Sequence, residues 1–234
     1  MLTEKFHAIT RNPTKCEKVI CCYKMLDTMT QKQRYGQLLM ALYHIYFQME
    51  RSLEANVDDS TISKLYTSLE PCFRTDAISE DVEHFLGSKW KDQYKPSDAV
   101  QRYVRHLADL ATSNAVLLIP YCFRLYVVMF EHAPTKISLL KRILPCTEKH
   151  GLAYFHFQQK SSLLLRSRIE DRLDGLDFDT DTENLLMSEM AFEVSLHQKI
   201  IDSMKARLSL GIALIAALLF LTCLLYAVSM SLVV

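Results

Sequence analysis

Glycine and proline are both scarce in this sequence, which has 5 glycines and 6 prolines among 234 residues. Proteins built from many tight turns need more of both, so an all-β sandwich is disfavoured. Neither sign of charge is in excess, because lysine plus arginine and aspartate plus glutamate each total 27. This balance argues against a nucleic-acid-binding protein, and a content of 50% hydrophobic residues argues against a disordered one.

The segment 208–234 lacks charge altogether, although the residues before it contain 54 charged side chains. An α-helix of that length spans about 40 Å, enough to cross a hydrocarbon core of about 30 Å. Lys205 and Arg207 directly precede the segment, and basic flanks favour the cytoplasmic side. The N-terminus has no apolar run typical of a signal peptide. We therefore expect a single-pass, tail-anchored protein whose residues 1–207 face the cytosol.

Cysteine patterns typical of zinc sites are also missing. The chain has seven cysteines, an odd number, and no C-x-x-C pair. The spacing of Cys16, Cys21 and Cys22 does not match that of zinc ligands. The sequence therefore predicts free thiols in a reducing compartment.

Apolar residues recur at helical spacing through the first 207 residues. Residues 37–50 have a broad apolar stripe, and residues 97–110 begin with Ser-Asp and continue with apolar residues three or four apart. Residues 79–81 (SED) predict another helix start, with Gly87 as its end. No segment alternates as a half-buried strand does. The prediction is one all-α domain over residues 1–207 followed by a transmembrane helix over 208–234.

Residues 114–130 form a second long apolar segment that is short of a membrane span. Arg124 lies near its middle, and a charge at that depth of a bilayer is costly. Pro120 would also kink a continuous helix. The segment is therefore predicted to be a buried helix of the cytosolic domain.

Several segments, in order along the chain, resemble landmarks of the heme oxygenase family. They are LMALYHIY (39–46), DVEHFLGSKW (81–90), QRYV (101–104), YCFRLY (121–126), GLAYF (151–155) and LRSR (165–168). Arg124 stands at the position of the family's distal-helix arginine. The C-terminal anchor is similar to that of the animal microsomal enzymes, which implies the endoplasmic reticulum membrane, with the mitochondrial outer membrane as an alternative.

The resemblance implies an all-α domain that holds heme between a proximal and a distal helix. The family oxidises heme to biliverdin, carbon monoxide and iron, with oxygen and with electrons from a cytochrome reductase. By the same resemblance, Arg11, Arg124 and Arg166 keep positive charge where the family binds the heme propionates.

The residues that carry the family's chemistry are not matched. The proximal histidine position falls on Pro13, or on Thr14 after a slip of one residue, while Glu17 keeps the position that orients the ligand. The distal Gly-Asp-x-x-Gly-Gly motif is replaced by residues 127–132, VVMFEH. Imidazole ligates the iron, glycine lets the backbone approach the porphyrin, and a polar group organises water around oxygen. The sequence lacks all three at these positions.

Two other histidines are candidate iron ligands. His7 would lie about 9 Å upstream of the proximal position in a continuous helix, and His132 follows the distal segment. The favoured interpretation is a degenerate family member without the usual ligation and turnover. The alternatives are an active heme oxygenase with His7 or His132 as axial ligand, or a non-catalytic porphyrin-binding or scaffold protein.

Overall fold

The computed structural model describes residues 1–11, 15–131, 133–147, 150–156 and 162–204, with backbone alone for 15–20, 23, 162 and 163. Its α-helices are α1 (Leu2–Thr10), α2 (Lys15–Met29), α3 (Lys32–Glu54), α4 (Ser60–Leu69), α5 (Thr75–Leu86), α6 (Trp90–Gln93), α7 (Asp98–Ser113), α8 (Ile119–Tyr126), α9 (Ala133–Ile143), α10 (Ser162–Asp174) and α11 (Thr180–Ser203). Short 3₁₀ helices are η1 (Glu70–Cys72), η2 (Ala115–Leu118), η3 (Val128–Phe130) and η4 (Ala153–Phe155). Within these ranges there is no strand, so the all-α prediction is confirmed.

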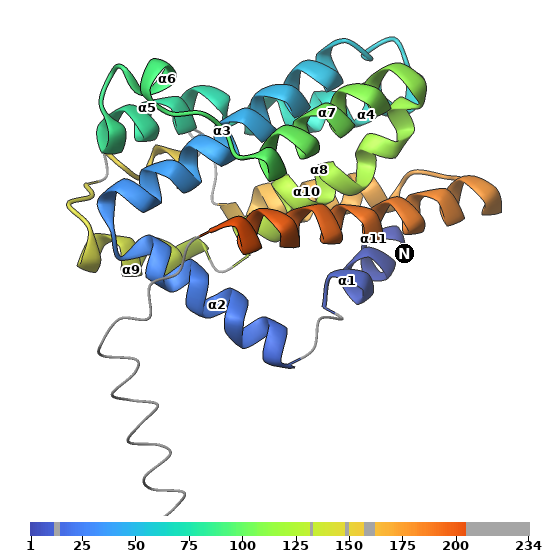
Figure 1. Cartoon of the computed structure of the whole chain (residues 1–234). Coiled ribbons are helices and arrows are strands. Elements are labelled where there is room, and N and C mark those ends of the chain that lie inside the picture. The colour runs from blue at the N-terminus through green and yellow to red at the C-terminus, as the bar shows by residue number, and fades with distance from the viewer. Residues whose placement is uncertain (12–14, 132, 148–149, 157–161, 205–234) are drawn as a thin grey trace, which may run out of the picture. The chain divides into compact units, whose positions relative to one another are not determined.

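Helix α3 lies at the centre of the packing, beside α5 and α7 (Figure 1). Its inward stripe includes Leu39, Tyr46 and Met49, each no more than 1% exposed. Gly36 lets α3 approach α5 closely, because a Cβ there would lie 2.7 Å from the Leu86 side chain. Helix α11 contacts α1, α7 and α8, and so joins the N-terminal helix to the middle of the chain.

Local caps explain some helix starts, and one long-range cap explains a start that the sequence analysis misplaced. Ser97 caps α7 through the Val100 N–H, as predicted. Helix α5 begins at Thr75 rather than near residue 80. Its first N–H groups are bound by the side chain of Glu50 from α3, with Arg74 N donating to Glu50 Oε1 at 2.6 Å. Gly87, with φ of 88°, follows the last residue of α5 as predicted.

The apolar stretch predicted as one buried helix over 114–130 is divided into η2, α8 and η3. Pro120 stands in the first turn of α8, where a missing N–H is tolerated. Every residue of α8 is buried. Burial is therefore confirmed, whereas a single continuous helix is wrong.

No single helix among the described residues has both the length and the apolarity needed to span a bilayer. By length and composition alone, one bent pair, 115–130 with 133–143, meets that criterion together. The predicted anchor at 208–234 lies outside the described residues. The compact unit formed by the described chain ends at Met204.

Candidate functional site

A buried ion pair joins α8 to α11. Arg124 Nε donates to Glu193 Oε2 at 2.7 Å, and the two side chains are 9% and 0% exposed. Tyr103 of α7 donates to the other carboxylate oxygen at 3.1 Å. Burial raises the pKa of Glu193, and the Arg124 guanidinium offsets part of that rise. The resemblance implied that Arg124 contacts a heme propionate. In the structure, Arg124 is paired with the carboxylate of Glu193 inside the protein.

A second carboxylate lies one turn earlier on α11. Glu189 Oε1 accepts hydrogen bonds from Tyr121 at 2.5 Å and from His106 Nε2 at 2.7 Å. Burial and this hydrogen bond raise the pKa of Tyr121 well above its usual value. The α7–α8–α11 seam, formed by these residues with Tyr103, Arg124 and Glu193, is a polar layer in which α7 and α8 both bond to α11. The sequence analysis did not single out Glu189 or Glu193, although their spacing of four within an apolar stripe was visible.

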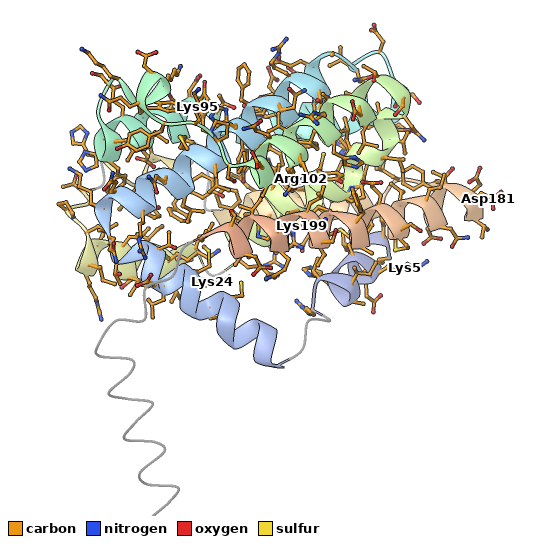
Figure 2. All side chains as sticks on the ribbon, viewed as in Figure 1. Lys5, Lys24, Lys95, Arg102, Asp181 and Lys199 are labelled. Carbon is orange, nitrogen blue, oxygen red and sulfur yellow. The ribbon has the colours of Figure 1, made fainter. Side chains whose placement is uncertain are left out.

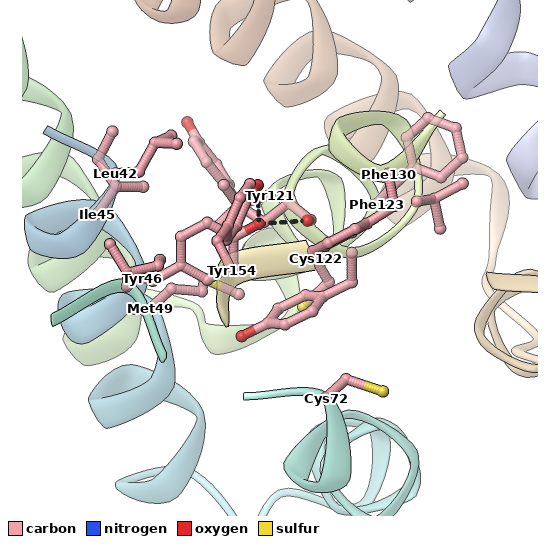
Figure 3. Packing of buried hydrophobic residues seen from close by; sticks show 14 of the residues in the cluster. Leu42, Ile45, Tyr46, Met49, Cys72, Tyr121, Cys122, Phe123, Phe130 and Tyr154 are labelled. Carbon is pink, nitrogen blue, oxygen red and sulfur yellow. Dashed lines mark hydrogen bonds between the residues drawn. The ribbon is translucent and has the colours of Figure 1, made fainter. Parts of the chain in front are cut away.

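The turn after α8 is apolar. Val127 is 0% exposed, and Phe130 packs against Tyr154 with 5.3 Å between ring centroids (Figure 3). Tyr46 donates to the Leu125 carbonyl at 2.6 Å and so holds the last turn of α8 to α3. Apolar side chains therefore occupy the positions of Val127 and Val128, where the resemblance placed the first glycine and the aspartate. Such side chains cannot organise water as a carboxylate does.

His7 lies between two carboxylates. Its Nε2 is 3.3 Å from Glu170 Oε1 of α10, and its Nδ1 is 3.9 Å from Glu131 Oε1. The ring edge packs on Phe123, with 4.8 Å between centroids. Both ring nitrogens are therefore directed at protein acids, and the contacts attach α1 to α10.

Two of the predicted arginines join the same charged cluster. Arg166 Nη2 lies 3.1 Å from Glu170 and 3.4 Å from Glu131. Arg11 Nη2 lies 3.9 Å from Glu131. The structure thus brings His7, Arg11 and Arg166 together, but around Glu131 and Glu170, and apart from the buried ion pair of Arg124.

His197 of α11 is a residue that the sequence analysis did not select. Burial, together with the nearby charges of Arg124 and Lys136, lowers the pKa of His197 to about 3. Lys136 of α9 is held by a 2.8 Å hydrogen bond to the Met129 carbonyl. Among the described residues, His197 has no hydrogen-bond or ion-pair partner. A pKa this low keeps the imidazole neutral near pH 7.

Comparison with known proteins decides the family. A sequence model described as heme oxygenase matches residues 2–199. The chain belongs to the heme oxygenase family. Heme oxygenase 2 of Synechocystis sp. is 24% identical over 207 residues, covering 87% of this chain and 80% of that protein. The heme oxygenase of Rhodella violacea is 22% identical over 212 residues, covering 90% and 88%.

Solved heme oxygenases share the fold. The crystal structure of heme oxygenase 2 from Chlamydomonas reinhardtii without heme has a TM-score of 0.81 at 22% identity, covering 89% of this chain and 99% of that one. Heme oxygenase-2 of Synechocystis in complex with heme and NO has a TM-score of 0.76 at 22% identity, covering 86% and 84%. The helices described above therefore form the all-α heme oxygenase fold.

Two chemical requirements of heme oxidation can be compared with the described residues of this chain. A neutral imidazole with a free nitrogen can ligate iron, and His197 has that property. Oxygen chemistry also needs a polar group that organises water, and the side chains of Val127–Phe130 supply none. The described residues thus include a neutral imidazole, whereas the turn Val127–Phe130 has no polar side chain that could organise water.

Other predicted site residues fall outside the described part of the structure. These are Pro13, Thr14 and His132, and the side chain of Glu17. Within the described ranges, no group of three or more His, Cys, Asp or Glu side chains could hold a metal ion. The described cysteines at positions 21, 22, 72, 122 and 146 are free thiols, as predicted.

Proposed function

We propose that this chain is a membrane-anchored member of the heme oxygenase family that binds a metalloporphyrin without oxidising it. The observation that carries the proposal is the packed apolar turn Val127–Phe130 after α8. The family's reaction, oxidative cleavage of heme to biliverdin, carbon monoxide and iron, needs a close backbone approach and an ordered water network. Branched and aromatic side chains at this turn oppose both.

Retention of porphyrin binding is supported by the fold, which this chain shares with solved heme oxygenases. When bound, heme would supply the redox chemistry of its iron, and the protein would supply a ligand, orientation and an apolar environment. Core aromatic residues of α3 and α8 keep the helical frame. The relative from Synechocystis is known in complex with heme and NO, which makes heme the first ligand to test.

The membrane part of the proposal depends on the uncharged segment 208–234 and its basic flank, Lys205 and Arg207. We propose a single span in the endoplasmic reticulum membrane with residues 1–207 in the cytosol. Alkaline extraction of membranes from cells that express the full chain checks this. The chain should stay in the pellet, and a variant without 208–234 should be released. Release of the full chain would contradict the anchor.

Turnover is tested with the full chain in detergent, loaded with hemin and supplied with NADPH and a cytochrome reductase. Heme oxygenase 2 of Synechocystis serves as the positive control, with its own reductant. We expect saturable hemin binding and no biliverdin absorption band. Biliverdin at the rate of the positive control would overturn the loss of turnover.

The alternative, an active heme oxygenase with His7 or His132 as axial ligand, predicts biliverdin that disappears in His7→Ala or His132→Ala. The contacts of His7 with Glu170 and Glu131 oppose ligation, because an imidazole held by two carboxylates must leave both to bind iron. A scaffold protein without any ligand predicts no saturable hemin binding at all.

A further inference from the structure

The end of α11 is where the chain leaves the described domain. The compact unit ends at Met204, and the uncharged segment 208–234 begins four residues later. Four residues of extended chain span at most about 14 Å. With the membrane span proposed above, the surface around Met204 is therefore the part of the domain that the chain keeps nearest to the lipid headgroups.

Helix α2 packs on this end of α11. Lys24 Nζ of α2 lies 2.9 Å from Asp202, at the edge of the domain that Figure 2 shows. One turn later, Thr28 Oγ1 lies 3.9 Å from Met204 Sδ. Leu26 stands between these two contacts in the sequence, points to the other side of the helix and is 45% exposed. An apolar side chain is thus open to solvent beside the point where the chain leaves the domain.

The last residues of α9 lie at the same end of the domain. His84 Nε2 of α5 is 3.3 Å from the carbonyl of Pro145, directly after α9. The next residue, Phe85, packs on Tyr35 of α3 with 5.1 Å between ring centroids. The end of α5 therefore joins the end of α9 to the start of α3, which follows α2 (Figure 1). Ile143, the last residue of α9, is 37% exposed.

Basic side chains accompany these two exposed apolar residues. Lys32 begins α3, and Lys141 and Arg142 lie in the last turn of α9, all three exposed. Helix α9 contains no acid. The described acids of α2 and of the last turn of α11, Asp27 and Asp202, are each paired with a base. Because the whole chain has no net charge, this end of the domain is locally basic.

We propose that the α2–α9 surface, formed by Leu26, Lys32, Lys141, Arg142 and Ile143, lies on the anionic lipid headgroups of the membrane that holds the anchor. Lysine and arginine near a bilayer are attracted by its anionic lipids. The two apolar side chains enter the boundary between headgroups and acyl chains. The occupant is a bilayer rather than a protein, because the proposed span begins four residues after the domain ends. This inference depends on the membrane span in the proposed function and adds the orientation of the domain.

Hydrogen–deuterium exchange of the full chain in lipid nanodiscs tests the contact. One set of discs contains phosphatidylcholine alone, and the other also contains phosphatidylserine. Peptides that cover residues 24–34 and 139–147 should exchange more slowly in the discs with phosphatidylserine. The difference between the two sets should disappear in 1 M salt, because salt screens the attraction between exposed charges.

A matched pair of variants separates this surface from charge in general. Lys32→Glu combined with Arg142→Glu should lose the slower exchange. Lys64→Glu combined with Arg105→Glu changes two exposed bases of α4 and α7 and should keep it. Leu26→Ser keeps every charge and should lose part of the slower exchange. Far-ultraviolet circular dichroism that matches wild type shows that each variant is folded.

Equal exchange of wild type in both sets of discs, with the chain still embedded, would overturn the α2–α9 surface and leave the anchor intact. Slower exchange that persists in Lys32→Glu with Arg142→Glu would overturn the role of these basic residues. A wild-type chain that is not incorporated into either set of discs would overturn the anchor and the orientation together.

Discussion

The two halves of the segment from Tyr121 to Phe130 differ in the polarity of their side chains and in what those side chains contact. The first half, in α8, has polar side chains that bond to carboxylates: Tyr121 and Arg124 to α11, and Tyr126 to Glu50 of α3. The second half, from Val127 on, has only apolar side chains packed into the core or against it. Under the proposed function, contacts that hold the helices together are present in the first half, whereas groups for oxygen chemistry are absent from the second. A fold and its reaction therefore depend on separable residues only a turn or two apart.

The largest loss of stability is expected when a polar contact of α8 is removed. Glu193→Ala leaves the Arg124 guanidinium buried without its carboxylate, which should lower the free energy of unfolding by about 3–5 kcal/mol. Urea denaturation followed by circular dichroism measures this. The double variant Arg124→Met, Glu193→Leu should recover most of the loss, because no unpaired charge remains. A loss under about 1 kcal/mol in Glu193→Ala would mean that the seam does not hold α8.

The apolar half is probed by Val127→Gly. Removing a fully buried side chain and adding glycine should cost about 2–4 kcal/mol in the same measurement. The matched change at half-buried Val128 should cost less. Equal and small costs at both positions would contradict the view that Val127 fills space the fold needs.

His197 should make stability depend on pH. Its pKa is about 3 in the folded chain and about 6.5 when unfolded, so below pH 6.5 the unfolded chain binds more protons. Stability from this group is full above pH 6.5 and falls as the pH drops toward 3. Between pH 7.5 and 5.5, wild type should lose about 1 kcal/mol more than His197→Gln. Parallel losses would show that this imidazole is not kept neutral.

The smallest effect is expected in the charged cluster around His7. Glu170→Gln weakens contacts with His7 and Arg166, all of them partly exposed. The expected loss is about 0.5–1 kcal/mol, and most of it should vanish in 1 M salt because such pairs are screened. A loss as large as that of Glu193→Ala would place this cluster, rather than the α7–α8–α11 seam, at the centre of the fold's stability.

The sequence could predict features that depend on neighbouring residues. The helical stripe of α3, the Ser97 cap and the Gly87 helix end are of this kind. The start of α5 was misplaced because its cap, Glu50, comes from another helix. Likewise, nothing near Arg124 in the sequence indicates that its partner is Glu193, 69 residues away.

Only part of the candidate site could be predicted from the sequence. The loss of glycine and aspartate after α8 was visible as a departure from the family pattern, but the packing of Val127 against the core was not. Glu189, Glu193 and His197 follow one another at intervals of four along α11. That pattern marks one helix face, yet only the folded chain shows that the two acids have partners and that the histidine has none among the described residues.

A single-turnover experiment tests the central claim most directly. The hemin-loaded full chain is mixed with ascorbate in air, and the Soret band and the biliverdin band are followed together. The account predicts that the Soret band persists and no biliverdin forms, because the turn Val127–Phe130 offers no group to organise water around oxygen. Decay of the Soret band with stoichiometric biliverdin would contradict it.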